Sequence, residues 1–145
     1  MPNRFELGPV LADGDNFAFH RVEGVVVCRV WRRPDLSMEA GASCAERIER
    51  LFKGYSSSTP APPSLFDVSE GPSVMGPVSE GHVAQLLRGF EHRRQPLAVV
   101  CGEDGLKRMQ YGRLVGAHAK NMGSLHVDFA EGMAVMLSTK RSGRP

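Results

Sequence analysis

The sequence lacks the marks of disulfide-rich, zinc-binding and membrane proteins. Its three cysteines, Cys28, Cys44 and Cys101, lie far apart and form no C-x-x-C pair. An odd number of separated cysteines excludes a disulfide framework and argues against a structural zinc site. The longest unbroken apolar run is about five residues, far below the roughly 18 that span a bilayer. The first residues carry no apolar run of signal length, so we expect no membrane insertion and a cytoplasmic protein.

The chain also lacks a large excess of positive or negative charge. Eighteen basic and 16 acidic residues leave a formal net charge of +2, too small for a general attraction to nucleic acid or to anionic membranes. The five histidines show no metal-ligand spacing. The segment from Gly102 to Gly105 contains Glu103 and Asp104, which would repel a phosphate, and Asp104 is better explained as a helix cap. We therefore predict no metal, no cofactor and no nucleic-acid partner.

What the chain does contain is enough for one globular domain. It has 145 residues, of which 41% are hydrophobic, and this length supports a single core. We assign residues 1–16 to a flexible N-terminal arm, because they are rich in proline and glycine, and residues 140–145 to a basic tail. The domain is then 17–139, interrupted by a Ser/Pro-rich loop at 56–63.

The first half of the domain predicts a hairpin followed by a helix. Residues 17–23 and 25–31 are rich in Val and Phe, and Gly24 lies between them where a tight turn would need it. Ser37 is a suitable N-cap for a helix. One face of that helix is apolar at helical spacing and comprises Cys44, Ile48, Leu51, Phe52 and Tyr55.

The second half alternates strands and helices. We predict strands at 64–68, 96–101 and 125–129, and helices at 79–94, 104–118 and 131–139. The element order is therefore ββαβαβαβα. Repeated strand-helix units favour parallel pairing with right-handed crossovers, so we expect an α/β single domain with a mixed, mainly parallel central sheet.

Three segments resemble the STAS-like (anti-sigma factor antagonist-like) domains of bacteria. Residues 65–71, Leu-Phe-Asp-Val-Ser-Glu-Gly, look like the family's third strand running into a small loop. Residues 97–101 look like its next strand, and 125–137 like its closing strand and helix. The resemblance implies a non-catalytic regulatory or scaffold protein that binds a partner through the loop and helix after the third strand. That partner would be a kinase-like or other regulator, or a second copy of the chain.

In that family a regulatory serine, whose phosphorylation controls binding to a kinase, precedes the second helix. Counting from Asp67 places Gly76 and Pro77 at this position, and neither accepts phosphate. Ser79 takes the role only if the loop is two residues longer, so Ser79 is our candidate phospho-acceptor. A serine there is also explained as a plain N-cap, and Glu80 would repel an added phosphate at the same helix end.

The polar residues at the end of this strand and the start of the next helix form the predicted partner-binding site, since α/β sheets bind ligands at that edge. They are Asp67, Ser69, Ser73, Ser79, Glu80 and His82.

Two other functions compete with partner binding. A small-molecule or lipid binding protein would need a pocket between sheet and helices, which we place at Met109, Leu114, Met133 and Met136. A hydrolase would need Ser79 and His82 within hydrogen-bonding reach of each other. The sequence lacks a Gly-x-Ser-x-Gly elbow, so we predict that the protein is not an enzyme.

Overall fold

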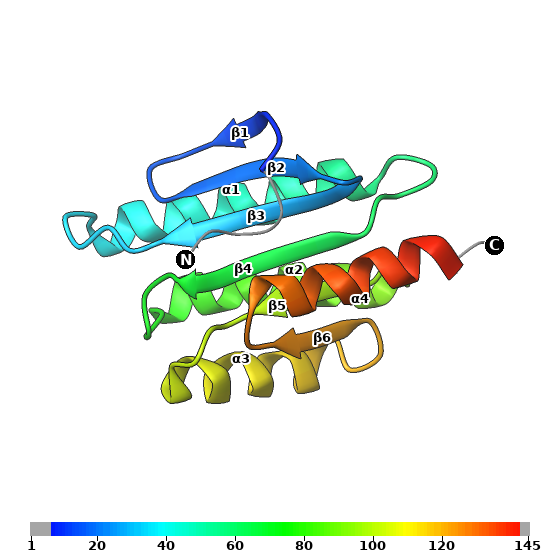
Figure 1. The fold of residues 1–145 in the computed structure, drawn as a ribbon. Helices are drawn as coiled ribbons and strands as arrows, with labels where there is room; N and C mark the ends of the chain where they lie inside the picture. The colour runs from blue at the N-terminus through cyan, green and yellow to red at the C-terminus, as the bar shows by residue number, and fades with distance from the viewer. Residues whose placement is uncertain (1–6, 143–145) are drawn as a thin grey trace.

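The computed structural model describes residues 7–142 and consists of a six-stranded sheet with helices on both faces (Figure 1). The strands lie side by side in the order in which they occur along the chain. They are β1 (Val10–Asp13), β2 (Phe17–Val22), β3 (Val25–Trp31), β4 (Ser64–Glu70), β5 (Leu97–Val100) and β6 (Gly123–His126). The helices are α1 (Met38–Ser56), α2 (Pro77–Arg93), α3 (Gly105–His118) and α4 (Phe129–Ser142).

The α/β class and the single domain are confirmed, and the sheet is mixed. β1, β2 and β3 pair antiparallel, whereas β3, β4, β5 and β6 pair in parallel. The description "mainly parallel" therefore fits only the second half of the sheet. The order ββαβαβαβα is correct from β2 onward and misses β1.

Strand β1 corrects the assignment of residues 1–16 to a flexible arm. Residues 10–13 pair with β2, with Val10 opposite His20 and Asp13 opposite Ala18. Backbone pairing stabilises this segment although its side chains are largely exposed, and for that reason hydrophobic periodicity did not predict it. Residues 1–6 of the predicted arm lie outside the described residues.

The hairpin of β2 and β3 forms where the sequence places it. Glu23 and Gly24 both have positive φ, 51° and 84°, as the tight turns that match the twist of antiparallel strands require. Glycine carries no steric penalty in this region of conformational space. Gly24 is therefore the residue that permits the two-residue connection.

Two of the three N-cap residues predicted from the sequence are confirmed. The Ser37 side chain accepts a hydrogen bond from the Ala40 N–H and caps α1, and the Asp104 side chain accepts from Leu106 and Lys107 and caps α3. The plain N-cap explanation for Ser79 is wrong. Helix α2 begins at Pro77, so Ser79 lies inside its first turn, and the N-cap is Gly76, which offers no side-chain hydrogen bond.

The last strand and helix begin earlier than predicted. Strand β6 covers 123–126 instead of 125–129, and α4 covers 129–142 instead of 131–139. Asp128 Oδ1 accepts a hydrogen bond from the Glu131 N–H, and the Glu131 carboxylate accepts one from the Val127 N–H. This reciprocal capping ends the strand and starts the helix. Residues 140–142 of the predicted tail continue α4, and 143–145 lie outside the described residues.

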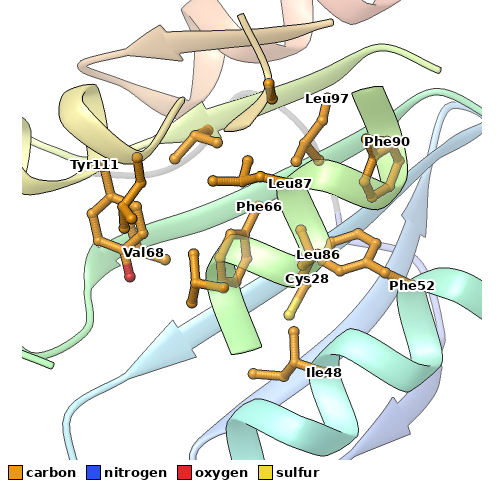
Figure 2. Packing of buried hydrophobic residues seen from close by; sticks show 14 of the residues in the cluster. Cys28, Ile48, Phe52, Phe66, Val68, Leu86, Leu87, Phe90, Leu97 and Tyr111 are labelled. Atoms are coloured by element: carbon orange, nitrogen blue, oxygen red, sulfur yellow. The ribbon is translucent and has the colours of Figure 1, made fainter. Parts of the chain in front are cut away.

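The core consists of two hydrophobic clusters, one on each face of the sheet. Helices α1, α2 and α3 cover one face and α4 covers the other (Figure 1). The larger cluster is built around aromatic rings: Phe52 packs edge-on against Phe66 and Phe90, with ring centroids 5.8 and 5.6 Å apart (Figure 2). The smaller cluster contains Met133 and Met136 of α4. Edge-to-face rings add to the stability supplied by burial alone.

Candidate functional site

A groove of about 1000 Å³ lies between the first turns of α1 and α2. Its floor is formed by residues of β3 and β4 that face these helices, Val30, Phe66 and Val68. The segment between β3 and α1 and the loop between β4 and α2 complete its walls. The groove therefore lies at the carboxyl ends of two adjacent parallel strands, which is where α/β sheets usually bind ligands.

The surface around the groove exposes large apolar side chains. Met38 begins α1 and is 76% exposed, Val74 of the β4–α2 loop is 66% exposed, and Val78 in the first turn of α2 is 61% exposed. Leu106 and Met109, in the first turns of α3, are also exposed. Because α1, α2 and α3 each follow a parallel strand, these helices begin at one edge of the sheet, at the left of Figure 1, and the five residues belong to their first turns or to the loop before α2. We call them the apolar rim.

The loop that carries part of this rim is held by the start of α3. Lys107 is only 3% exposed, and its Nζ donates to the carbonyl oxygens of Ser69 and Gly71, each at 2.9 Å. The Ser73 hydroxyl donates to the Asp104 carboxylate. This hydrogen bond is the largest of the effects that lower the pKa of Asp104 from its usual value. The end of β4 and the β4–α2 loop are therefore held at three residues, Ser69, Gly71 and Ser73.

The structure divides the six predicted site residues between the two faces of the sheet. Ser73 and Ser79 line the groove. Asp67 and Ser69 lie on β4 at the alternate positions to Phe66 and Val68, so they belong to the α4 face, where the Ser69 hydroxyl donates to Asp67 Oδ1 at 2.6 Å. Those two residues are not brought together with Ser79.

The remaining two predicted residues are engaged with neighbouring helices. The Glu80 carboxylate accepts from Arg113 of α3 at 3.0 Å. His82 Nδ1 lies 2.9 Å from the Glu49 carboxylate of α1. His82 therefore links the two helices that wall the groove, and no hydrogen bond joins it to Ser79 among residues 7–142. The geometry that a hydrolase at these two residues requires is not present.

The four residues predicted to line a pocket for a small ligand do not lie together. Leu114 belongs to the cluster under α1 to α3, Met133 and Met136 belong to the cluster under α4, and all three are buried. Met109 is 66% exposed on the surface. The apolar spacing correctly identified core positions, but spacing within one helix cannot tell which face of the sheet that helix covers.

Sequence reasoning missed Lys107, Met38 and Val74. A lysine on a polar helix usually points to solvent, and the two apolar residues fall outside any periodic pattern. A usable signal was the presence of single large apolar residues at the starts of successive helices, where polar capping residues are preferred.

Comparisons with known proteins support the fold alone. No protein-family model matches the sequence, and no curated protein matches it. The NMR structure of the protein TM1081 is similar, with a TM-score of 0.54 and 15% sequence identity, over 87% of this chain and 92% of that one. Within the described part of the chain, no helix has the length and hydropathy to cross a membrane, and no group of three or more His, Cys, Asp or Glu residues is placed to hold a metal ion.

Proposed function

We propose that this chain is a STAS-like, non-catalytic regulatory or scaffold module of the bacterial cytoplasm that binds a partner protein at the apolar rim. The observation that carries the proposal is the clustering of exposed apolar surface. Of the eight large hydrophobic residues exposed in the described chain, five belong to the rim. Three of these five, Met38, Val74 and Val78, line the groove, and the other two lie at the start of the neighbouring helix α3. Scattered exposed apolar residues need no explanation, whereas their gathering at one edge of a sheet supports an interaction site.

The loop beneath the rim is suited to present a fixed surface. Lys107 and Asp104 hold it from below through Ser69, Gly71 and Ser73. A surface that is ordered before binding loses less conformational entropy when a partner docks. Hydroxyl and carboxylate groups beside the rim would supply specificity, as the polar periphery of an interface usually does. The partner is a kinase-like or other regulator, or a second copy of the chain.

Ser79 is the residue through which we propose that phosphorylation would act. It lies in the first turn of α2, where a phosphate gains from the free N–H groups and the helix dipole. It also lines the groove and follows Val78 of the rim directly. A phosphate at Ser79 would therefore place charge beside the apolar surface and weaken an apolar partner's binding.

The test is capture of partners from the native cytosol with the purified chain, followed by affinity measurements on whichever protein is captured repeatedly. We expect Val78→Asp to lower the affinity by roughly tenfold or more, because a charge at the centre of an apolar contact is left without a partner. Val135→Asp is the matched control, since Val135 is 37% exposed on α4, away from the rim. Ser79→Asp should weaken the same complex if Ser79 is a switch.

Equal affinities for the wild type, Val78→Asp and Val135→Asp would show that the partner binds elsewhere and would refute the proposal. Equal affinities for the wild type and Ser79→Asp would remove the phospho-switch alone. Sedimentation of the isolated chain distinguishes the two kinds of partner, because a self-association through the rim would be concentration-dependent and lost in Val78→Asp.

A further inference from the structure

The groove extends inward from the three rim residues that line it, Met38, Val74 and Val78. Six residues of β3, β4, α1 and α2 give it an apolar wall: Val30, Ile48, Phe66, Val68, Val83 and Leu86. The adjoining hydroxyl of Tyr111 donates to Met75 Sδ at 3.6 Å, which is a weak acceptor. A volume of about 1000 Å³ lies at the upper end of the range for small-molecule sites. The cavity is therefore larger than one docked side chain requires.

Positive and hydrogen-bonding groups gather where β3 leads into α1. Arg32 is exposed, lines the groove, and makes no ion pair or side-chain hydrogen bond within residues 7–142. Asn16 also lines the groove, and its buried Oδ1 has no hydrogen-bond partner in that range. Its backbone oxygen accepts from the Trp31 N–H, which places Asn16 next to Arg32.

The other charges at this mouth leave Arg32 available. Arg33 is held by Asp35 through two hydrogen bonds of 2.8 and 2.7 Å, so its charge is already compensated. Glu39 is the acidic lining residue, and it lies in the first turn of α1, where the helix dipole favours a carboxylate. The first turns of α1 and α2 both face the groove and add partial positive charge.

We propose that the groove binds a single-chain amphiphile, a free long-chain carboxylic acid, with its hydrocarbon tail against the apolar wall and its carboxylate at Arg32 and Asn16. Charge complementarity selects this occupant, since Arg32, a cation without an ion-pair partner within residues 7–142, lies at the mouth of a largely apolar cavity. The Asn16 Oδ1 is buried, and the amide Nδ2, which makes no hydrogen bond within residues 7–142, is the group left to donate to the carboxylate. The site adjoins the rim, because Met38, Val74 and Val78 also line the groove, whereas the head-group residues Arg32 and Asn16 are not part of the rim.

The first measurement is the fluorescence increase of cis-parinaric acid on binding the full chain, followed by its displacement with unlabelled acids. We expect saturable binding of one molecule per chain. Replacing palmitic acid with myristic acid should lower the affinity about fifteenfold, because each methylene moved out of water contributes about a fourfold change. Hexadecanol, which has the same tail and no charge, should bind more weakly than palmitic acid.

Two variants locate the tail and the head group separately. Ala45 is half-buried in the groove wall, so Ala45→Phe should fill the cavity and abolish binding of both the acid and the alcohol. Arg32→Gln should weaken palmitic acid about tenfold through loss of a charge-assisted hydrogen bond and leave hexadecanol unchanged. Arg50→Gln is the control, because Arg50 is exposed on α1 and pairs with Glu46 outside the groove.

The thiols give a readout that does not depend on the probe. Cys44 lines the groove and is 7% exposed, whereas Cys28 and Cys101 are fully buried. Bound palmitic acid should slow the alkylation of Cys44 by iodoacetamide, and the same acid should give no protection in Ala45→Phe. Urea unfolding of each variant verifies that a lost signal comes from a folded protein.

Three results would overturn the proposal: no saturable binding of cis-parinaric acid, unchanged binding in Ala45→Phe, or equal effects of Arg32→Gln on the acid and the alcohol. The partner proposal fails on a different result, unchanged partner affinity in Val78→Asp, whatever Arg32→Gln does to the binding of palmitic acid. Loss of partner capture in Ala45→Phe without any binding of the acid would assign the groove to a segment of the partner protein instead.

Discussion

Replacement of Lys107 by methionine tests the idea that α3 holds the β4–α2 loop in place. The Lys107 ammonium group is buried and donates to two carbonyl oxygens at 2.9 Å. Hydrogen bonds from a charged donor contribute roughly 1.5–3 kcal/mol each, so losing both costs about 3–6 kcal/mol. Methionine has a similar length and no charge, so the mutant avoids the desolvation penalty of the buried ammonium group. This offsets part of the free energy lost with the two hydrogen bonds. We expect a net loss of about 2–3 kcal/mol in the free energy of unfolding.

The assay is urea unfolding followed by circular dichroism, together with amide hydrogen exchange. With a denaturant slope of about 2 kcal/mol per molar, the midpoint should fall by about 1–1.5 M. Exchange should accelerate first at residues 69–73, because the released carbonyls belong to that loop. Lys120→Met is the control, since Lys120 is exposed. A midpoint for Lys107→Met equal to that of the control would refute the reasoning.

Two further predictions concern acid sensitivity and close packing. The pKa of Asp104 is lowered in the folded protein, so its contribution to stability is present above the unfolded pKa and is lost as the pH falls through the folded value. The protection factors of the amides at residues 71–76, which are corrected for the intrinsic pH dependence of exchange, should therefore fall below about pH 4. A pH profile of protection in the wild type matched by Asp104→Asn would contradict this. Gly132→Ala should destabilise by about 1–3 kcal/mol in thermal unfolding, because its Cβ would lie 2.9 Å from Val100 Cγ2. Gly116→Ala, whose added Cβ would meet no atom within 4 Å beyond its chain neighbours and the backbone of its own helix, should stabilise α3 by about 0.5–1 kcal/mol. A loss of stability like that of Gly132→Ala would contradict the packing explanation, because helix propensity favours alanine over glycine at both positions.

Local chemistry made the central elements predictable. Gly24 permits the turn between β2 and β3, and Ser37 and Asp104 cap their helices, because these effects act between residues a few positions apart. The weakest assignments were β1 and β6. Strand β1 buries little of its apolar surface and shows no hydrophobic periodicity. The start of α4 depends on reciprocal caps at Asp128 and Glu131, which override the apolar alternation of 125–129.

For the candidate site, the sequence pointed to the edge of the sheet at which the groove lies, but not to the residues that line it. It placed partner binding after the third predicted strand, and the groove and the rim lie there. The sequence did not predict that Ser79 lies on the same groove as Met38, which is 41 positions earlier in the chain. It also did not predict that Asp67 lies on the opposite face of the sheet from Ser79. Those relations depend on which face of the sheet α1 and α2 cover.

The sequence by itself determined the α/β class, the order of elements from β2 onward and the residues that pack as a core, because hydrophobic periodicity and capping are properties of neighbouring residues. Only the tertiary structure decided the addition of β1, the burial of Lys107, the division of Asp67 and Ser79 between opposite faces, and the opening of a groove at the starts of α1 and α2. Each of these results from contacts between segments far apart in the chain, and no local pattern specifies how such segments meet.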